Sequence, residues 1–337
     1  MSQRVGGKVY VGYGRVTTFG DSMPTLEELA DSAQLVRELE PLAAAELDRH
    51  LSMVKNWMPH EYVPWAQGTN FDGIYGGEPW NEEQSPVDGV ARTALVVNLL
   101  TEDNLPSYHR ALSDITGRES AWGEWVQRWT AEEARHAIAM RDYMTVTRAV
   151  DPVVLEQERM AHMSRGFESS NEEHVLKSMG YVSFQELATR ISHRNTGRHT
   201  TDEGLDRLLA RIAADENLHM LFYRNIMGAA FDAAPDASMV AVLDVAQNFA
   251  MPGSEVDGFA RRSFAIAMAG IYDLRIHHDE VLAPVLRAWN VWDRTDFGAI
   301  GERARDELAT FMADLDETAK RFEEKRSARA ERVAARS

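Results

Sequence analysis

Residues 129–136 of the chain read WTAEEARH, and residues 212–219 read IAADENLH. Each stretch contains a Glu-x-x-His tetrad, running from Glu133 to His136 and from Glu216 to His219. On an α-helix, positions i and i+3 share one face, so each tetrad offers a carboxylate and an imidazole to the same point. Chance supplies about one such tetrad in a chain of this composition. The spacing alone therefore does not identify a site.

Two further glutamates stand at matching distances before the tetrads. Glu102 precedes Glu133 by almost the same interval of sequence as Glu186 precedes Glu216. The chain thus repeats the order Glu, then Glu-x-x-His, and each repeat suits two antiparallel helices joined by a short connection. One Glu from each of two helices, with a Glu-x-x-His from each of two others, is the ligand pattern of bundles that bind two metal ions. The pattern predicts a four-helix core.

The helical faces that carry the tetrads are otherwise mostly apolar. Trp125, Trp129 and Met140 flank the first tetrad, and Ile212 and Tyr223 flank the second. A carboxylate on an apolar stripe is costly unless it is paired or bound to a metal. Four converging carboxylates would repel one another, and two divalent cations would neutralise them. Oxygen and imidazole ligands without thiolate suit iron or manganese, although the intrinsic affinity order favours copper or zinc.

The composition excludes several classes of protein. The 337 residues contain no Cys, which excludes disulfide scaffolds, Cys-ligated zinc or iron–sulfur sites and thiol nucleophiles. With 36 Lys+Arg against 53 Asp+Glu, the net charge is −17, which argues against nucleic acid as a general partner. No apolar run approaches the ~20 residues of a membrane span, and no apolar signal segment opens the chain. We therefore expect no membrane span and a cytoplasmic location.

Helical periodicity dominates from residue 25 to about residue 320, and alternating strand patterns are almost absent. Start signals recur, because Ser85-Pro86 and Asp151-Pro152 each place a capping residue before a proline. Residues 86–112 suit one uninterrupted helix. We predict an all-α fold.

The remaining organisation is one domain with two distinct ends. The domain is expected to span residues 24–320. Residues 1–23 are rich in Gly and lack a helical period, so a poorly structured extension is expected there. Residues 321–337 are expected to form a charged tail. The Pro-, Gly- and Trp-rich residues 56–85 predict a long surface loop.

Four segments together resemble the soluble acyl-acyl-carrier-protein desaturases (fatty acid desaturase type 2), most closely their actinobacterial members. They are TEDNLPSY at 101–108, WTAEEARH at 129–136, SFQELATRISH at 183–193 and IAADENLH at 212–219. The resemblance covers roughly residues 30 to 300. It implies a ferritin-like homodimer with two iron ions in the four-helix core of each subunit.

The resemblance also implies six metal ligands, all of them Glu or His: Glu102, Glu133, His136, Glu186, Glu216 and His219. By matching position, the glutamates of the two tetrads would bridge both irons. Glu102 and His136 would complete the coordination of one iron, and Glu186 and His219 that of the other.

Four further residues match functional positions of the family. Thr189, one turn after Glu186, matches a threonine beside the oxygen site. Asp215 and Trp129 match positions next to the ligand histidines, where hydrogen bonds would fix the orientation of a ring. Trp57 matches a tryptophan associated with electron transfer to the metals. The alternatives are a helical back-bond for Thr189, packing for the two tryptophans and an ordinary charged residue before a glutamate for Asp215.

The activity that the resemblance implies is that of an oxidoreductase. It would use O2 to introduce a cis double bond into a saturated fatty acyl chain carried on acyl carrier protein, in fatty acid biosynthesis. Two electrons per turnover would come from a ferredoxin-type donor, because the chain has no flavin or iron–sulfur motif. The same ligands would also serve a hydroxylase or N-oxygenase, an iron store, or a non-catalytic carrier-binding relative.

A basic stripe suggests where an acidic carrier would dock. Arg190, Arg194 and Arg198 recur every four residues and would lie along one helical face. Such a stripe would attract an acidic protein. A solvated face without a partner is the alternative.

Overall fold

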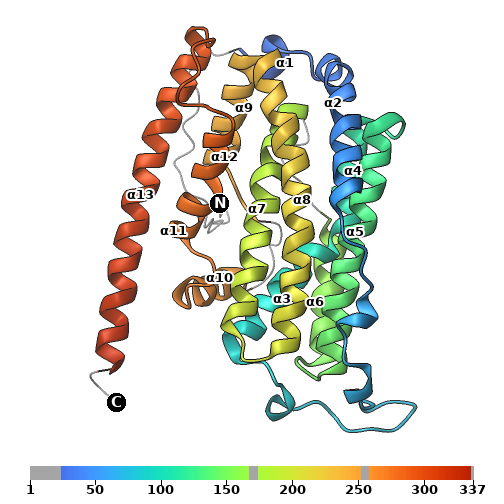
Figure 1. Cartoon of the computed structure of the whole chain (residues 1–337). Coiled ribbons are helices and arrows are strands. Elements are labelled where there is room, and N and C mark those ends of the chain that lie inside the picture. Colours follow the sequence, from blue (N-terminus) through green and yellow to red (C-terminus); the bar gives the residue numbers. More distant parts are fainter. Residues whose placement is uncertain (1–23, 167–173, 252–257, 335–337) are drawn as a thin grey trace, which may run out of the picture.

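The computed structural model describes residues 24–166, 174–251 and 258–334 (Figure 1). Within these ranges every regular element is a helix, and Phe71 and Glu78 form an isolated β-bridge. The predicted all-α class is therefore confirmed. The extension expected over residues 1–23 lies outside the described residues.

In chain order, the α-helices are α1 (Leu26–Leu29), α2 (Ser32–Met53), α3 (Gly89–Asp103), α4 (Leu105–Thr116), α5 (Ser120–Val146), α6 (Pro152–Arg165), α7 (Val175–His199), α8 (Glu203–Ala233), α9 (Pro235–Gln247), α10 (Phe259–Met268), α11 (Leu274–Ile276), α12 (Ala283–Ala288) and α13 (Ala299–Ala334). A π-helical turn, His277–Leu282, joins α11 to α12. Three 3₁₀ turns lie in the loop between α2 and α3: Pro59–Glu61, Trp65–Gln67 and Glu82–Gln84.

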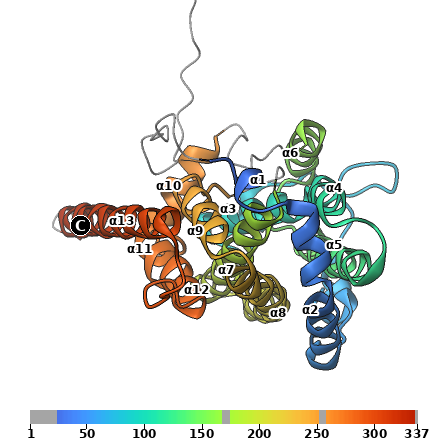
Figure 2. The same ribbon diagram turned by 90° about the horizontal axis from the view of Figure 1, so that it is seen from above.

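The core consists of α3, α5, α7 and α8, in which α3 packs on α5 and α7, and α8 packs on the same two helices. The α2 helix covers α5 and α8, while α9 covers α7 and α8 and is itself covered by α13. The two views agree that α2 and α13 lie on opposite sides of this core (Figures 1 and 2). The four-helix core is ferritin-like, as predicted.

The predicted single helix over residues 86–112 is wrong in two respects. The helix begins at Gly89, because Asp88 rather than Ser85 caps it by accepting hydrogen bonds from the amides of Val90 and Ala91 at 3.1 and 2.9 Å. It also breaks at Asn104, since Pro106 occupies the first turn of α4 and lacks the N–H that a continuous helix needs. The helix start predicted at Asp151-Pro152 is confirmed, because Asp151 caps α6.

Two hairpins bring the repeated glutamates to one level. Glu186 lies as far before the end of α7 as Glu216 lies after the start of α8. In the other half, α4 takes the place of further turns of α3, so the interval from Glu102 to the end of α4 nearly equals that from the start of α5 to Glu133. The equal arms explain why the two glutamate pairs have near-equal spacings along the chain.

A hydrogen-bonded cap fixes the register between the two hairpins. Asp202 caps α8 by accepting from the Leu205 amide at 2.8 Å, and the same oxygen accepts from the Tyr143 hydroxyl at 2.5 Å. Because Tyr143 lies near the end of α5, this contact ties α5 to the start of α8. Glu133 and Glu216 are thereby held opposite each other.

The charged tail expected from residue 321 is part of a long helix. The α13 helix runs from Ala299 to Ala334 without a break. Its buried residues, among them Leu308 and Leu315, anchor the earlier turns on the core, and the basic turns follow as a solvated continuation. Among the described helices, none is long and apolar enough to cross a membrane.

Candidate metal centre

The site is a polar layer between two apolar clusters of the core. Along α5, Trp125 and Trp129 belong to one cluster and Met140 to the other, and along α8 Ile212 and Phe222 are divided in the same way. The six predicted ligands lie between these clusters on α3, α5, α7 and α8, and none is more than 6% exposed. Apolar side chains therefore close both ends of the layer.

Three carboxylates surround the inward nitrogen of His136. Its Nδ1 lies 3.1 Å from Glu216 Oε1, 3.5 Å from Glu133 Oε2 and 3.9 Å from Glu102 Oε2. These four residues offer ligand atoms that all lie within 4.8 Å of one another. They could hold one metal ion.

The inward nitrogen of His219 has a matching environment. Its Nδ1 lies 2.7 Å from Glu133 Oε1, 3.7 Å from Glu186 Oε2 and 3.8 Å from Glu216 Oε2. These four residues form a second group of ligand atoms within 4.8 Å of one another. Glu133 and Glu216 belong to both groups and direct one oxygen toward each histidine, which is the arrangement that bridging ligands require.

The donor set fits two cations. Five inward-facing atoms, two of which (His219 Nδ1 and Glu133 Oε1) lie only 2.7 Å apart, make no well-directed hydrogen bond in the described part of the chain: Glu133 Oε1, His136 Nδ1, Glu186 Oε2, Glu216 Oε1 and His219 Nδ1. Buried polar atoms are costly when they are unpaired, so a group of them around one point calls for an explanation. Divalent ions accepting these lone pairs would supply one.

The electrostatics of the protein chain alone indicate the same need. Burial and the charges of Glu133 and Glu216 hold the pKa of both Glu102 and Glu186 well above its ordinary value. Burial also opposes ionisation of Glu133, but the imidazoles of His136 and His219 lower the pKa of that carboxyl. Two bound divalent ions would offset the repulsion among these carboxylates, which in their absence is relieved by protonation.

The outward nitrogen of His136 meets the carboxylate of Asp215. The distance from Nε2 to Asp215 Oδ2 is 3.4 Å, and the same oxygen accepts from Trp57 Nε1 at 2.7 Å and from Arg135 Nη2 at 2.9 Å. Burial works against the charge of Asp215, yet His136, the hydrogen bond from Trp57 and the charge of Arg211 lower its pKa to about 2. A carboxylate at this position accepts the Nε2–H and leaves the Nδ1 lone pair facing the site.

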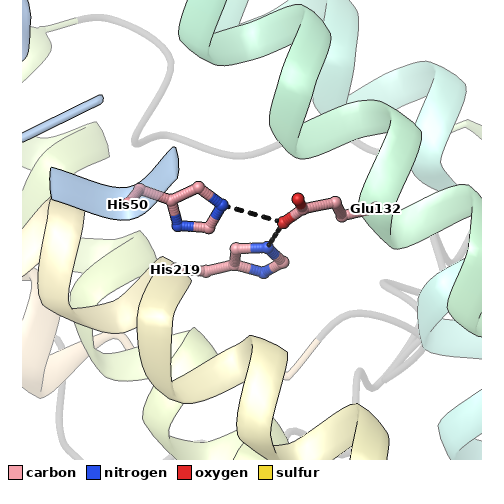
Figure 3. A group of neighbouring side chains, drawn as sticks. All are labelled: His50, Glu132 and His219. Carbon is pink, nitrogen blue, oxygen red and sulfur yellow. Dashed lines mark hydrogen bonds and ion pairs between the residues drawn. The ribbon is translucent and has the colours of Figure 1, made fainter. Parts of the chain in front are cut away.

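The outward nitrogen of His219 meets Glu132, which the sequence analysis did not select. Glu132 Oε2 lies 2.8 Å from His219 Nε2 and 3.0 Å from His50 Nε2, so one oxygen serves both rings (Figure 3). Glu132 directly precedes Glu133 as Asp215 directly precedes Glu216. That repeat in the sequence could have revealed Glu132. His50 lies 82 residues away on α2, and no local pattern marks it.

Of the other predicted site residues, Trp129 contacts a predicted ligand and Thr189 bonds within its own helix. Trp129 Nε1 donates to Glu186 Oε1 at 3.1 Å, so this ring lies directly beside a predicted ligand. The Thr189 hydroxyl donates back to the carbonyl of Gln185 at 2.9 Å and accepts from the Gln185 side chain at 3.0 Å. This is the helical back-bond, and it leaves a role for Thr189 as a prediction.

His193 is a further buried residue at the site that the sequence analysis left without a role. Its Nε2 lies 3.0 Å from Glu102 Oε1, and its Nδ1 lies 3.2 Å from the amide nitrogen of Asn98. Asn98 donates to Nδ1, so Nε2 carries the proton that Glu102 accepts. Burial lowers the pKa of His193 to about 4. His193 follows Glu186 by two helical turns on the same face, which is the signal that could have identified it.

The fold and this site define a ferritin-like bundle with a doubled carboxylate–histidine site. A family model described as fatty acid desaturase (type 2) matches residues 31–336. The chain therefore belongs to the fatty acid desaturase family, as the resemblance in its sequence indicated.

Three relatives place the chain within that family. DesA1 of Mycobacterium tuberculosis H37Rv, named as an acyl-acyl-carrier-protein desaturase, is 50% identical over 297 residues, which are 86% of this chain and 88% of DesA1. A chloroplastic stearoyl-acyl-carrier-protein 9-desaturase of Oryza sativa subsp. japonica is 30% identical over 329 residues, covering 92% of this chain and 81% of the rice protein. The X-ray structure of DesA2 from M. tuberculosis H37Rv, titled as an acyl-acyl-carrier-protein desaturase, has a TM-score of 0.64 at 29% identity, covering 82% of this chain and 99% of DesA2.

Proposed function

We propose that the protein is an O2-dependent di-iron desaturase that introduces a cis double bond into a fatty acyl chain carried on acyl carrier protein, in fatty acid biosynthesis. The observation that carries the proposal is the pair of overlapping ligand groups that share Glu133 and Glu216. The names of the relatives supply the substrate class. Homodimerisation, a ferredoxin-type donor and the cytoplasmic location belong to the same proposal.

The six ligands would hold two iron ions in a dry, carboxylate-rich layer. When bound, the irons would supply the activation of O2 and the oxidising power for the reaction. The overall change converts two adjacent methylenes, O2, two electrons and two protons into a cis double bond and two molecules of water. The protein would contribute positioning, since the reaction needs one methylene pair held near the site and water kept away from it.

The carboxylates outside the site would set the chemistry of the histidine ligands. Asp215 and Glu132 each accept an Nε2–H, which directs the Nδ1 lone pair of His136 and His219 inward. Trp129 would hold Glu186 in place by its indole N–H. Thr189 would take part beside the oxygen site only by releasing the carbonyl of Gln185.

Trp57 supports a route for external electrons. Its ring lies parallel to that of His136, with centroids 6.2 Å apart and an interplanar angle of 11°. Its N–H donates to Asp215, which in turn contacts His136, and the Arg135 guanidinium lies 4.5 Å above the indole. The loop that carries Trp57 would thus connect the donor to one side of the metal centre.

The test of the function is the mass of the acyl chain after reaction. Iron-loaded protein is incubated with C16 and C18 acyl-carrier-protein substrates, O2 and a reduced ferredoxin system. We expect a loss of two hydrogens, and fragmentation would then locate the double bond. A gain of one oxygen would instead identify a hydroxylase, and an unchanged mass in iron-loaded protein would favour a non-catalytic relative.

Reversing two charges of the basic stripe tests carrier docking. Arg194 already pairs with Asp206 at 2.8 Å, so the change is best made at Arg190 and Arg198. We expect Arg190→Glu with Arg198→Glu to weaken carrier binding about tenfold, roughly 1.4 kcal/mol, and to reduce its salt dependence. Calorimetric titration at two salt concentrations measures both quantities. Unchanged affinity would mean that the stripe is only a solvated face.

A further inference from the structure

The two ligand histidines are held by carboxylates with closely related surroundings. Glu132 and Asp215 each precede a shared glutamate, and each is paired with an arginine four residues earlier on the same helix, Arg128 and Arg211. Each carboxylate also directs one oxygen to a ligand histidine of the other hairpin. The surroundings differ in the ring that donates to that oxygen, which is the indole of Trp57 for Asp215.

His50 occupies the position in the second half that corresponds to Trp57 in the first. It is fully buried, and its ring lies against His219, with centroids 5.7 Å apart and an interplanar angle of 25°. Trp125 packs edge-on against the same ring at 5.1 Å. Figure 3 shows both imidazoles, from α2 and α8, directed at Glu132, which faces them from α5.

The hydrogen bonding of His50 explains why a polar ring is kept in this apolar position. Its Nδ1 is buried and has no hydrogen-bond partner in the described part of the chain. Leaving one nitrogen unpaired is costly, so an apolar side chain would be favoured if packing were the only requirement. Its Nε2 is 3.0 Å from Glu132 Oε2, and a carboxylate can only accept, so His50 donates there.

We propose that His50 is a positioning residue that fixes Glu132 and, through it, the orientation and tautomer of His219 as a metal ligand. The inference rests on the proposed metal centre. Arg128 contacts only Oε1 of Glu132, and its side chain is 39% exposed, so without His50 the carboxylate can turn toward that arginine and solvent. Asp215 is better secured, because its Oδ2 keeps Arg135 when Trp57 is removed. The His219 half is therefore the more sensitive of the two.

A third metal ion among His50, Glu132 and His219 is the competing assignment. Their ligand atoms do lie within 4.8 Å of one another. An ion there would need the Nε2 lone pair of His219, whose other nitrogen already faces the main site. His219 would then have to lose both N–H protons, while Arg128 already supplies Glu132 with a positive charge at 2.5 Å. The triad is better suited to hydrogen bonding.

Cobalt(II) titration of the full-length metal-free protein tests the proposal without relying on catalysis. His50→Phe removes the donor and keeps a ring against Trp125, His50→Leu removes both, and His50→Gln keeps an N–H donor. We expect the wild-type chain to bind two ions. In the Phe and Leu variants one ion should bind about 10- to 100-fold more weakly, the range for lost outer hydrogen bonds, while the other changes little. His50→Gln should recover most of the loss.

Proton NMR of the cobalt-loaded protein in water identifies the half that is affected. Each ligand histidine contributes one exchangeable, strongly shifted Nε2–H signal. Substitution at His50 should shift or broaden the His219 signal alone, and the matched control Trp57→Phe should affect the His136 signal alone and by less.

The outcomes separate this proposal from the function on which it rests. Two ions bound by the wild type, with affinities and signals unchanged in the folded His50 variants, would overturn only the role of His50. Three ions per wild-type chain would identify the triad as a metal site and overturn it too. Fewer than two ions would overturn both the metal centre and the positioning role.

Discussion

Glu133→Ala is expected to abolish tight binding of both iron ions while leaving the helical fold in place. Glu133 belongs to both ligand groups, with one oxygen 3.5 Å from His136 Nδ1 and the other 2.7 Å from His219 Nδ1. Removing it takes one ligand from each ion and leaves Glu216 as the remaining shared carboxylate. Iron content after desalting measures the effect, and far-UV circular dichroism checks the fold.

Matched variants make this result specific. Glu124→Ala changes an exposed glutamate on the same helix, so it should keep two irons per chain. Glu216→Ala should behave like Glu133→Ala, because Glu216 also belongs to both groups. Glu102→Ala removes a residue of one ligand group only and should weaken the binding of one ion. Two irons retained by the Glu133→Ala chain would refute the bridging role.

Glu186→Gln is expected to stabilise the metal-free protein at neutral pH while weakening metal binding in the His219 half. Burial and the charges of Glu133 and Glu216 raise the pKa of Glu186 well above its ordinary value of 4.5. The amide is neutral at every pH, and its oxygen can still accept from Trp129, 3.1 Å away in the wild type. The melting temperature of the metal-free variant should exceed that of the wild type by a few degrees.

The pH dependence follows from the direction of this shift. A carboxyl whose pKa is higher in the folded than in the unfolded chain contributes its full stability below the unfolded value. That contribution is lost as the pH rises from about 4.5 through the folded pKa. The advantage of Glu186→Gln should therefore be small near pH 4.5 and grow toward pH 8.

Thermal unfolding of metal-free proteins from pH 4.5 to 8 tests this expectation. Glu324→Gln, at an exposed position on α13, is the matched control and should follow the wild type at every pH. Parallel curves for Glu186→Gln and the wild type would show that the carboxylates do not repel one another in the folded chain. Loading with iron should reverse the order, because only the wild type gains the full binding energy.

Local patterns were sufficient to predict the helical class and the set of candidate ligands. The i, i+3 spacing within each tetrad places both of its side chains on one face whatever the rest of the chain does. Equal hairpin arms then bring Glu102 beside Glu133 and Glu186 beside Glu216. The near-equal spacings along the chain therefore place all four glutamates at the same height along the bundle axis. The break at Asn104 was missed because the helical spacing of apolar residues continues across it, although Pro106 lies in the first turn after the break.

The sequence by itself therefore determined the all-α fold and the six side chains that can face a common point, because these depend on helical periodicity and local spacing, and the resemblance of four segments indicated the family. The resemblance had indicated Asp215 beside a ligand histidine, but only the tertiary structure decided that Glu132 lies behind His219 and which distant rings support the two carboxylates. His50 reaches Glu132 across 82 residues, and Trp57 reaches Asp215 across 158. Such contacts depend on how α2 and its following loop pack across the bundle, and helix packing depends on side-chain shape and burial rather than on any local period.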